Sequence, residues 1–573
     1  MTTPAISGID NKTSPSREAT HRFQSVHLGN FKAFGRTQRI PIRPLTLIFG
    51  PNSAGKSSFI HGLLYAHEAH NSHSFNSLNV TRPRLGGDSV DLGGFGQFVY
   101  RGVRADDDAN EADIRHGVEW GVDLSTADLP SRLQELLAPC RNVRLSVSID
   151  CVHMDPCWSV TQRSTTGNDF RHDDLFPGIA SYEITADSDL LVRATGGISA
   201  IRENGADKKW ELRIDHLDAN HPILSADHKP MPSSHTADAP HPDDLCEAKE
   251  SQRKFELLKN GNVVLQQGSF LPNGISPETF GAFAGLEIPA LRRLDVLIRG
   301  LAEYVGNTLQ RLRYLGPLRS YPSRQLAFSE DHDRNWFAGG GYAWDRVRRN
   351  SGIREQVNDW LGAKWMKTRY RLDSRDLVSL EDIEREFLQM WEEYEANEDY
   401  KPSGAQLADR CRNYSAIKDD LVLMDVVRNV VVSHRDIGIG ISQVLPVLVS
   451  AFAADNETIA IEQPELHLHP ALQAELGDVF IKAALCGKQN TFLLETHSEH
   501  LILRIMRRIR EVAEGTLPEE LPCIRAQDVS VLFVEPRESG SGIRVLELDD
   551  EGEFLDPWPG GFFEEGFRER FGK

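Results

Sequence analysis

The stretch "GPNSAGKS", residues 50–57, constrains the fold more than any other part of the 573-residue chain. It fits the pattern G-x-x-x-x-G-K-[ST], and it lies between "PLTLIFG", which predicts a buried strand, and "GKSSFIHGLLYAHEAH", which predicts a helix. The glycines let the loop curl so that backbone N–H groups face phosphate oxygens, and the helix presents its positive end to the same charge. A strand, a phosphate-binding loop and a helix in this order predict an α/β fold.

The loop residues have distinct expected roles toward ATP and Mg²⁺. Lys56 is expected to reach the β- and γ-phosphates, and Ser57 to supply a hydroxyl to Mg²⁺. Ser58 is a less favourable neighbour for the phosphates. The residues expected to bind the nucleotide in this loop are Gly50, Pro51, Asn52, Ser53, Ala54, Gly55, Lys56, Ser57 and Ser58.

Two further apolar strands end in polar side chains. "TIAIE" ends on Glu462, from which a carboxylate can hold a metal-bound water, and "NTFLLETHSEH" places His497 just beyond its strand. Ligands of open α/β sheets lie at the carboxyl ends of the strands, so His497 is expected to face the γ-phosphate.

The segment "DIGIGISQVLPVLVSAF", residues 436–452, predicts a second helix N-terminus suited to an anion. Ser442 is expected to be its N-cap, with Pro446 in the first turn. One phosphate does not need two such helix ends. We therefore expect a head-to-tail homodimer, or a higher homo-oligomer, in which Gly440 and Ser442 close over the nucleotide of the other subunit.

Composition excludes some classes of protein and leaves others open. The chain has 64 Lys and Arg against 84 Asp and Glu, a net charge of −20, which opposes indiscriminate nucleic-acid binding but allows a local basic groove. Its seven cysteines form no CxxC pair, which favours a reducing cytoplasm. No apolar stretch reaches the roughly 20 residues of a membrane span, so no membrane association is expected.

The pattern along the chain predicts five regions. Residues 1–20 are expected to be a disordered tail, 21–104 and 429–515 the two parts of the ATPase head, and 516–573 a strand hairpin with Asp549 and Asp550 in its turn. Residues 105–428 are expected to be a large mixed α+β insertion with an antiparallel sheet, helices and a mobile loop at 218–250. In "SLEDIEREFLQMWEEYEAN" the apolar residues form one helical stripe, which favours a place in the core.

These motifs together resemble the ABC-type ATPase heads of the RecF, SMC and OLD group. Nearer still are bacterial ATPases annotated AAA that carry a short C-terminal domain of unknown function, to which "YLGPLRSYPSR" and "DEGEFLDPWPGGFFEE" are similar. The resemblance implies a P-loop head split in sequence, Mg²⁺ held by Ser57 and Glu462, and ATP hydrolysis. It also implies a separate effector protein and a role in antiviral defence.

The chain departs from the ABC pattern after Glu462. The glutamate that orients water in ordinary heads is here Gln463, and a carboxylate returns only at Glu465. Glutamine can orient water without accepting its proton, so hydrolysis through Gln463 would be slow. Glu465 is the preferred base, the alternative being that it holds the loop "HLHP", whose His467 and His469 are expected to make packing and intersubunit contacts.

Other residues keep two interpretations. Gln97 in "DLGGFGQ" is either a metal-reaching Q-loop residue or part of a glycine-rich turn, and Arg319 is either a charge clamp or a structural salt bridge. Four arginines in "HLILRIMRRIREVAEG" favour a solvated face over a DNA contact.

The leading hypothesis is an ATP-driven switch that signals to a partner. The alternatives are a RecF-like repair ATPase that clamps DNA and a scaffold that binds ATP without hydrolysing it. Too few residues follow His497 for a Toprim nuclease, so no nuclease is expected in the chain.

Overall fold

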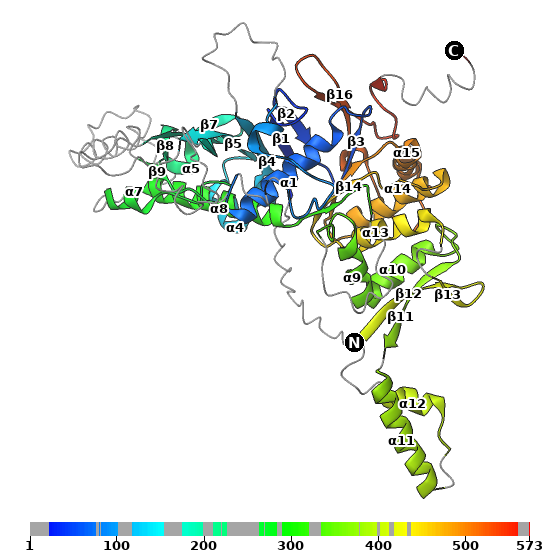
Figure 1. Ribbon diagram of the computed structural model, residues 1–573. Helices are drawn as coiled ribbons and strands as arrows, with labels where there is room; N and C mark the ends of the chain where they lie inside the picture. Colours follow the sequence, from blue (N-terminus) through cyan, green and yellow to red (C-terminus); the bar gives the residue numbers. More distant parts are fainter. Residues whose placement is uncertain are drawn as a thin grey trace, which may run out of the picture.

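Figure 1 shows the computed structural model of the chain. The expected tail at 1–20 and most of the expected mobile loop at 218–250 lie outside the residues that the structure describes. The described residues are 22–75, 80, 82–100, 117–153, 175–198, 210–218, 221–225, 263–268, 270–282, 289–319, 334–377, 379–397, 401–411, 418–432, 437–559 and 572.

A six-stranded sheet carries the predicted nucleotide site. Its first five strands are parallel and its last strand is antiparallel to its neighbour. The five parallel strands therefore end at one edge, where the side chains predicted to bind the nucleotide follow them. In spatial order the strands are β10 (Leu312–Leu315), β14 (Thr458–Glu462), β15 (Thr491–Glu495), β3 (Leu45–Phe49), β16 (Val529–Glu535) and β17 (Gly542–Leu546).

Alternate residues of these strands face two different cores, as the two-residue period of a strand requires. Leu47 of β3 belongs to the core on one face, and Ile48 belongs to the core on the other. The helices on the Leu47 face are α9 (Gly341–Arg349), α10 (Ser351–Leu361), α13 (Ile439–Ala453), α14 (Pro470–Leu485) and α15 (Glu499–Glu514). The helices in the Ile48 core include α1 (Lys56–Ser72) and α8 (Pro289–Gln310).

An antiparallel eight-stranded sheet shares the Ile48 core, so the two sheets are joined by one continuous apolar interior. Three of its strands, at 142–153, 175–186 and 210–217, contain the alternating segments "VRLSVSIDC", "SYEITA" and "WELRIDHL". In spatial order the sheet contains β2 (Gln38–Pro41), β1 (Ser25–Gly29), β4 (Val118–Ser125), β5 (Asn142–His153), β6 (Leu175–Ala186), β7 (Asp189–Ile198), β8 (Trp210–Leu217) and β9 (Val264–Leu265).

The borders expected at 104/105 and 428/429 do not coincide with borders between sheets. β4 pairs with β1, so the strands of the expected insertion continue a sheet that begins before the phosphate loop. β10, also within 105–428, pairs with β14 of the site sheet. The C-terminal strand β16 pairs in parallel with β3. Local sequence does not encode these pairings, because they depend on which distant strand edge is free.

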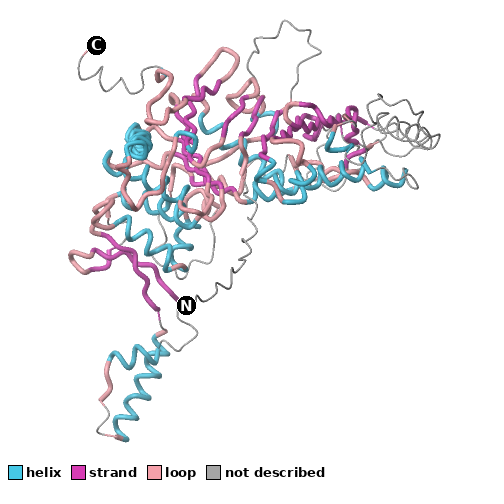
Figure 2. Tube along the Cα trace, turned by 180° about the vertical axis from the view of Figure 1, so that it is seen from behind, coloured by secondary structure: helices cyan, strands magenta, loops and turns pink. Residues whose placement is uncertain are grey.

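A third sheet contains β11 (Tyr370–Leu377), β12 (Lys418–Asp425) and β13 (Val430–Val432), and beyond it α11 (Leu380–Ala396) and α12 (Gly404–Cys411) project from the body as an arm (Figures 1 and 2). The expected core stripe of α11 is wrong for most of its members. Met390 is buried, whereas Phe387 and Trp391 are exposed. The physical reason is that α11 packs mainly against the short helix α12.

Short elements complete the described part of the chain. They are α3 (Phe95–Phe98), α4 (Ser131–Leu136), α5 (Pro222–Ser225), α7 (Pro277–Ala282) and the 3₁₀ helices η2 (Thr126–Asp128) and η5 (Ala526–Asp528). β16 and β17 form the expected hairpin, but Asp549 and Asp550 lie in a separate turn after β17. No helix among these described elements is long and apolar enough to cross a membrane.

Candidate functional site

The phosphate loop connects β3 directly to α1, as its flanking patterns predicted. Gly50 and Gly55 both have positive φ, at 147° and 95°. A Cβ at Gly50 would clash with the carbonyl oxygen of Val534, and one at Gly55 would clash with Ala33. Gly55 is also the N-cap of α1, and no side chain caps this helix. The first N–H groups of α1 are therefore left for an anion.

Lys56 is held inside the loop by backbone oxygens. Its Nζ donates to the carbonyls of Gly50 at 3.1 Å and Pro51 at 3.0 Å, and its side chain is buried. Burial lowers the pKa of Lys56, while the nearby carboxylates of Glu495, Glu465 and Glu462 oppose that shift. A cation thus lies among several acids at this edge of the sheet.

Ser57 contacts a carboxylate that sequence reasoning missed. Its Oγ donates to Glu495 Oε2 at 2.7 Å, although the two residues are 438 positions apart. Glu495 is the last residue of β15 and pairs in register with Glu462 of β14. Burial and the charge of Glu462 raise the pKa of Glu495 to about 7. The sequence contained a signal for Glu495, because the strand "TFLLE" ends on an acid just as the strand "TIAIE" does.

Glu462 is surrounded by three residues that the motifs did not indicate. Tyr314 Oη donates to Glu462 Oε1 at 3.0 Å, and His61 Nε2 lies 3.6 Å from the same oxygen. The other ring nitrogen of His61 is 2.6 Å from Lys32 Nζ, which assigns the proton to Nε2, facing Glu462. Burial lowers the pKa of Lys32 to about 8. A tyrosine, a histidine and a lysine therefore position this carboxylate.

Glu465 and His497 are in direct contact. The backbone N–H of His497 donates to Glu465 Oε1 at 2.8 Å, whereas no described residue donates a hydrogen bond to the buried Glu465 Oε2. Burial raises the pKa of Glu465. Burial and the charge of Lys56 lower the pKa of the His497 imidazole, so this ring lies near the phosphate loop.

Gln463 occupies the other candidate position for orienting water. It has a positive φ of 46°, and its N–H donates to the Glu495 carbonyl at 2.7 Å. Its side chain is half-buried, whereas Glu465 is only 8% exposed. The two candidates thus differ in environment, and only Glu465 offers a buried carboxylate oxygen without a partner.

Arg319 binds backbone carbonyls, and no described residue forms a salt bridge with it. Its Nη2 donates to the carbonyls of Glu462 at 2.9 Å and Gln463 at 3.0 Å, while Gln443 Nε2 donates to the Arg319 carbonyl at 3.3 Å. Burial lowers the pKa of Arg319 to about 10. The guanidinium therefore connects the end of β14 to helix α13.

The segment from Gly438 to Ser442 begins a helix earlier than predicted. α13 begins at Ile439 with Gly438 as its N-cap, so the expectation that Ser442 caps this helix is wrong. Ser442 is buried, and its Oγ donates to the Ile439 carbonyl at 2.9 Å. Pro446 is consequently inside the helix and not in its first turn. Gly440 faces the carbonyl of His467, and a Cβ there would lie 3.0 Å from that oxygen.

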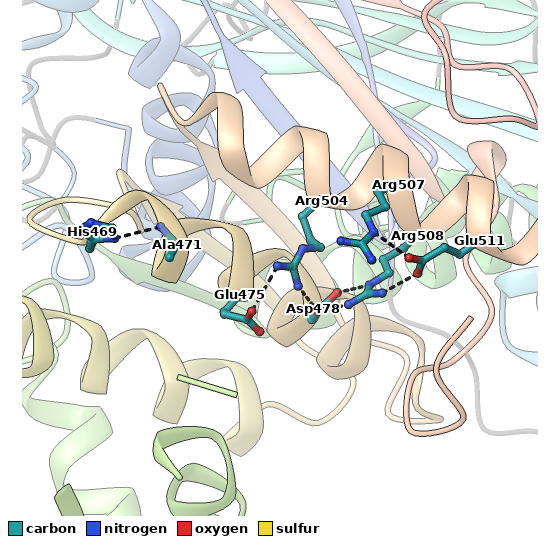
Figure 3. A network of polar contacts seen from close by, with 8 residues as sticks. All are labelled: His469, Ala471, Glu475, Asp478, Arg504, Arg507, Arg508 and Glu511. Atoms are coloured by element: carbon teal, nitrogen blue, oxygen red, sulfur yellow. Dashed lines mark hydrogen bonds and ion pairs between the residues drawn. The ribbon is translucent and has the colours of Figure 1, made fainter. Parts of the chain in front are cut away.

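The remaining candidates have structural contacts. His469 is the N-cap of α14, its Nδ1 accepting from Ala471 N at 3.3 Å (Figure 3). Gln97 is exposed in the short helix α3. The arginines of α15 bind acids: Arg504 and Arg508 both contact Asp478, and Arg507 contacts Glu511 (Figure 3). Arg510 contacts Glu553. This helix therefore offers no row of unpaired cations to DNA.

The residues at the site fit a magnesium nucleotide. Hydroxyl and carboxylate oxygens are the ligands that Mg²⁺ prefers, and Ser57, Glu462 and Glu495 supply them. In the described part of the chain, no group of three or more His, Cys, Asp or Glu side chains is arranged to hold a metal. Mg²⁺ does not need such a cage, since it usually binds through one or two protein groups, phosphates and waters.

Two family models match the chain. Residues 305–504 match the model described as "AAA domain, putative AbiEii toxin, Type IV TA system", and residues 524–569 match a model described as a protein of unknown function, DUF3696. These matches confirm the expected resemblance to AAA-annotated ATPases with a short C-terminal domain of unknown function. The phosphate loop lies outside both segments, and the structure brings it to them through β3, β15 and β16.

Several solved structures match most of the chain, but with low TM-scores and low sequence identity. An Smc head bound to the C-winged helix domain of ScpA has a TM-score of 0.36 and 10% identity, over 92% of this chain and 98% of that one. An SMC head domain from Thermotoga maritima has a TM-score of 0.33 and 8% identity, over 92% and 100%. One from Pyrococcus furiosus, bound to the C-terminal domain of ScpA, has a TM-score of 0.32 and 10% identity, over 92% and 96%. TM-scores this low support no inference about this chain. No curated protein matches it.

Proposed function

We propose that the protein binds and hydrolyses ATP and uses the reaction as a switch. The premise is that residues 305–504 carry an AAA-type ATPase domain. One observation carries the proposal. Ser57 of the phosphate loop donates to Glu495 at the end of β15, beside Glu462 at the end of β14. The loop that can bind phosphates and the acids that can serve hydrolysis are thus brought to one edge of a parallel sheet.

Different residues of the chain would bind the phosphates and Mg²⁺. The uncapped N-terminus of α1 and the loop N–H groups receive the phosphates, and Lys56 exchanges its two carbonyl contacts for phosphate oxygens. Ser57, Glu462 and Glu495 would hold Mg²⁺, which when bound supplies charge neutralisation between the β- and γ-phosphates. Tyr314 and His61 keep the carboxylate of Glu462 in position.

Glu465 is the proposed general base. Its Oε1 is fixed by the backbone of His497, which leaves the buried Oε2 to accept a proton from water. Burial raises the pKa of this carboxyl and so makes it a stronger base than an exposed glutamate. Gln463 is proposed to orient the same water, and His497, neutral and close to Lys56, to respond to the γ-phosphate.

We further propose head-to-tail homodimerisation on ATP. The N-terminus of α13 has no side-chain cap, Ile439 at its start is 48% exposed, and the described contacts do not connect it to the phosphate loop of its own chain. An uncapped helix N-terminus of this kind suits an anion held by a second copy. Gly440 would then face the nucleotide of that copy, and Ser442 would reach it only by leaving its buried contact with the Ile439 carbonyl.

We propose that the switch signals to a separate effector protein in antiviral defence. Signalling to a separate effector and antiviral defence were expected from resemblance alone. The DNA-clamping alternative loses its one specific feature, because the arginines of α15 are ion-paired. The scaffold alternative keeps its support from Gln463, so hydrolysis must be measured directly.

Phosphate release with ATP and Mg²⁺, together with light scattering of each sample, tests the proposal. We expect the parent to release phosphate, Lys56→Ala to lose nucleotide binding, and Glu465→Gln to accumulate as an ATP-bound dimer. A parent that dimerises on ATP without releasing phosphate would establish the scaffold instead. A parent that neither binds ATP nor dimerises would refute both.

A further inference from the structure

The arm formed by α11 and α12 has an apolar face that no described element covers. α11 packs on α12 through Met390 and Glu386, and Arg410 of α12 pairs with Glu393 at 2.6 Å. The arm projects away from both cores (Figures 1 and 2). A helix pair so far from the nucleotide site contributes nothing to that site's geometry.

Beside the inward face of α11 lies an aromatic stripe, consisting of Leu380, Phe387, Trp391 and Tyr394. These residues are 70%, 52%, 47% and 38% exposed. Their spacing places them on one side of the helix. The ring centroids of Phe387 and Trp391 lie 6.2 Å apart, and those of Trp391 and Tyr394 lie 5.7 Å apart, so the three aromatic rings of the stripe are contiguous.

Contiguous exposed apolar surface of this kind marks interaction sites, and Trp and Tyr are the residues that most often dominate binding energy. Single exposed apolar residues need no explanation, but four on one face of a projecting helix do. The end of the stripe is held in place, because Trp391 Nε1 donates to Glu395 Oε1 at 3.0 Å.

The charge around the stripe specifies the occupant. α11 carries only Arg385 as a basic side chain, against seven acidic ones: Glu381, Asp382, Glu384, Glu386, Glu392, Glu393 and Glu395. Helical spacing places Glu384 and Glu395 along the outer border of the stripe. A second copy of the same arm would bring like charges together, which is unfavourable.

We propose that the aromatic stripe of α11 is a docking site for a basic amphipathic helix of a partner protein. Leucine-like side chains of that helix would cover Phe387 and Trp391, and flanking lysines or arginines would meet Glu384 and Glu395. The inference relies on the proposed function only in naming the partner as the effector of the switch. The docking surface itself rests on exposure and charge.

The first experiment measures binding of fluorescent synthetic helices to the full chain by anisotropy. The basic peptide carries leucines at helical spacing flanked by lysines, and the matched acidic peptide carries glutamates instead. We expect Phe387→Ser with Trp391→Ser to weaken the basic peptide by about tenfold or more. Glu384→Lys should also weaken it, and this change keeps the apolar residues and the hydrogen bond from Trp391 to Glu395 intact. The matched control is Leu503→Ser, an apolar residue that is 44% exposed on α15 and should have little effect.

Equal binding of the acidic peptide, or equal weakening by Leu503→Ser, would overturn the proposal. So would a stripe variant that changes the homo-oligomeric state in light scattering, because a second copy would then be the occupant. Phosphate release is measured on every variant and should equal that of the parent. A parent that binds the basic peptide but releases no phosphate would refute the proposed function and leave the docking site standing.

The second experiment identifies the occupant in cells. A photo-crosslinking amino acid replaces Leu388, which is 61% exposed next to the stripe, and the linked segment is sequenced. A basic amphipathic segment of another protein would support the proposal. Linkage to the same chain, to a segment without that character, or to no protein would overturn it.

Discussion

At the scale of single residues, the site is defined by buried charges that share one small region. Glu462, Glu465 and Glu495 are each less than a tenth exposed, and Lys56 is the cation among them. Burial raises the pKa of Glu465 and of Glu495, because it disfavours the charged form. A bound magnesium nucleotide would change the charges around these residues, so their pKa values should shift when ATP binds.

Glu465→Gln should lower kcat for ATP hydrolysis by about 10²- to 10⁴-fold, the usual contribution of a general base. KM should change little, because Glu465 makes no expected contact with ATP. Gln463→Ala should only slow turnover, since it removes an orienting group and not the proton acceptor. Steady-state phosphate release measures both variants. A larger loss of kcat in Gln463→Ala than in Glu465→Gln would show that the base is assigned to the wrong residue.

Arg319→Lys should lower both stability and turnover. Lysine keeps the charge but cannot reproduce the forked contacts to the Glu462 and Gln463 carbonyls, and an unsatisfied buried group costs about 1–3 kcal/mol. Urea unfolding measures the loss of stability, and phosphate release should show a lower kcat with little change in KM. The exposed Arg371→Lys is the control. Unchanged unfolding of Arg319→Lys would mean that these contacts are dispensable.

At the scale of secondary-structure elements, a buried ion network pins α15 to α14 (Figure 3). Asp478 of α14 is fully buried and accepts hydrogen bonds from Arg504 at 2.6 Å and from Arg508 at 2.7 and 2.8 Å. The hydrogen bond to Asp478 raises the pKa of Arg508. Because α14 and α15 follow β14 and β15, this network also fixes the strand ends that carry Glu462 and His497.

Asp478→Ala should destabilise the protein by about 3–5 kcal/mol, because it removes the buried carboxylate that binds both Arg504 and Arg508 and leaves Arg508 paired with Glu511 alone. Chemical denaturation measures the effect. Glu475→Ala, which removes only a more exposed contact of Arg504, should cost less than about 1 kcal/mol. The double variant Asp478→Leu with Arg508→Leu should recover much of the loss. If the double variant is as unstable as the sum of both single variants, the pair is not coupled.

At the scale of the whole molecule, two sheets of different type share one core, and a charged cluster lies on β1, β4 and β5 of the antiparallel sheet. Asp123 of β4 accepts from Ser25 of β1 and from Arg144 of β5 at 2.7 Å, and His27 of β1 lies 3.1 Å from it. Burial alone would raise the pKa of Asp123. Hydrogen bonds from His27, Arg144 and Ser25 outweigh burial and hold this pKa well below its usual range.

The free energy of unfolding should therefore fall in acid. A carboxyl whose folded pKa is depressed contributes its full stability above its unfolded pKa, about 3.9, and loses it as the pH decreases toward the folded value. Urea unfolding between about pH 5 and pH 2 measures this slope, because the loss begins near the unfolded pKa and continues below it. Asp123→Asn should be less stable at neutral pH and show a shallower acid slope. An unaltered slope would assign the acid sensitivity to other carboxyls.

Residues inside a continuous motif could be predicted from the sequence, and residues that meet it from elsewhere could not. Lys56 and Ser57 follow from the loop pattern, and Glu462 and His497 from the rule that parallel strands end at one edge. The contacts of Tyr314, His61 and Lys32 around Glu462 could not be predicted, because these residues reach it from β10, α1 and the loop after β1. The expected cap at Ser442 failed because α13 begins three residues earlier.

The sequence by itself determined the α/β class, the phosphate loop and the strand ends that follow it, because glycine conformations, residue periodicity and strand termini are local properties. Tertiary structure alone decided that β4 extends the sheet of β1, that Glu495 meets Ser57 and that Arg319 joins β14 to α13. It also decided that the apolar face of α11 is exposed. The physical reason is common to these cases: an apolar period shows that a face can be buried, but only the packed chain determines which partner, if any, buries it.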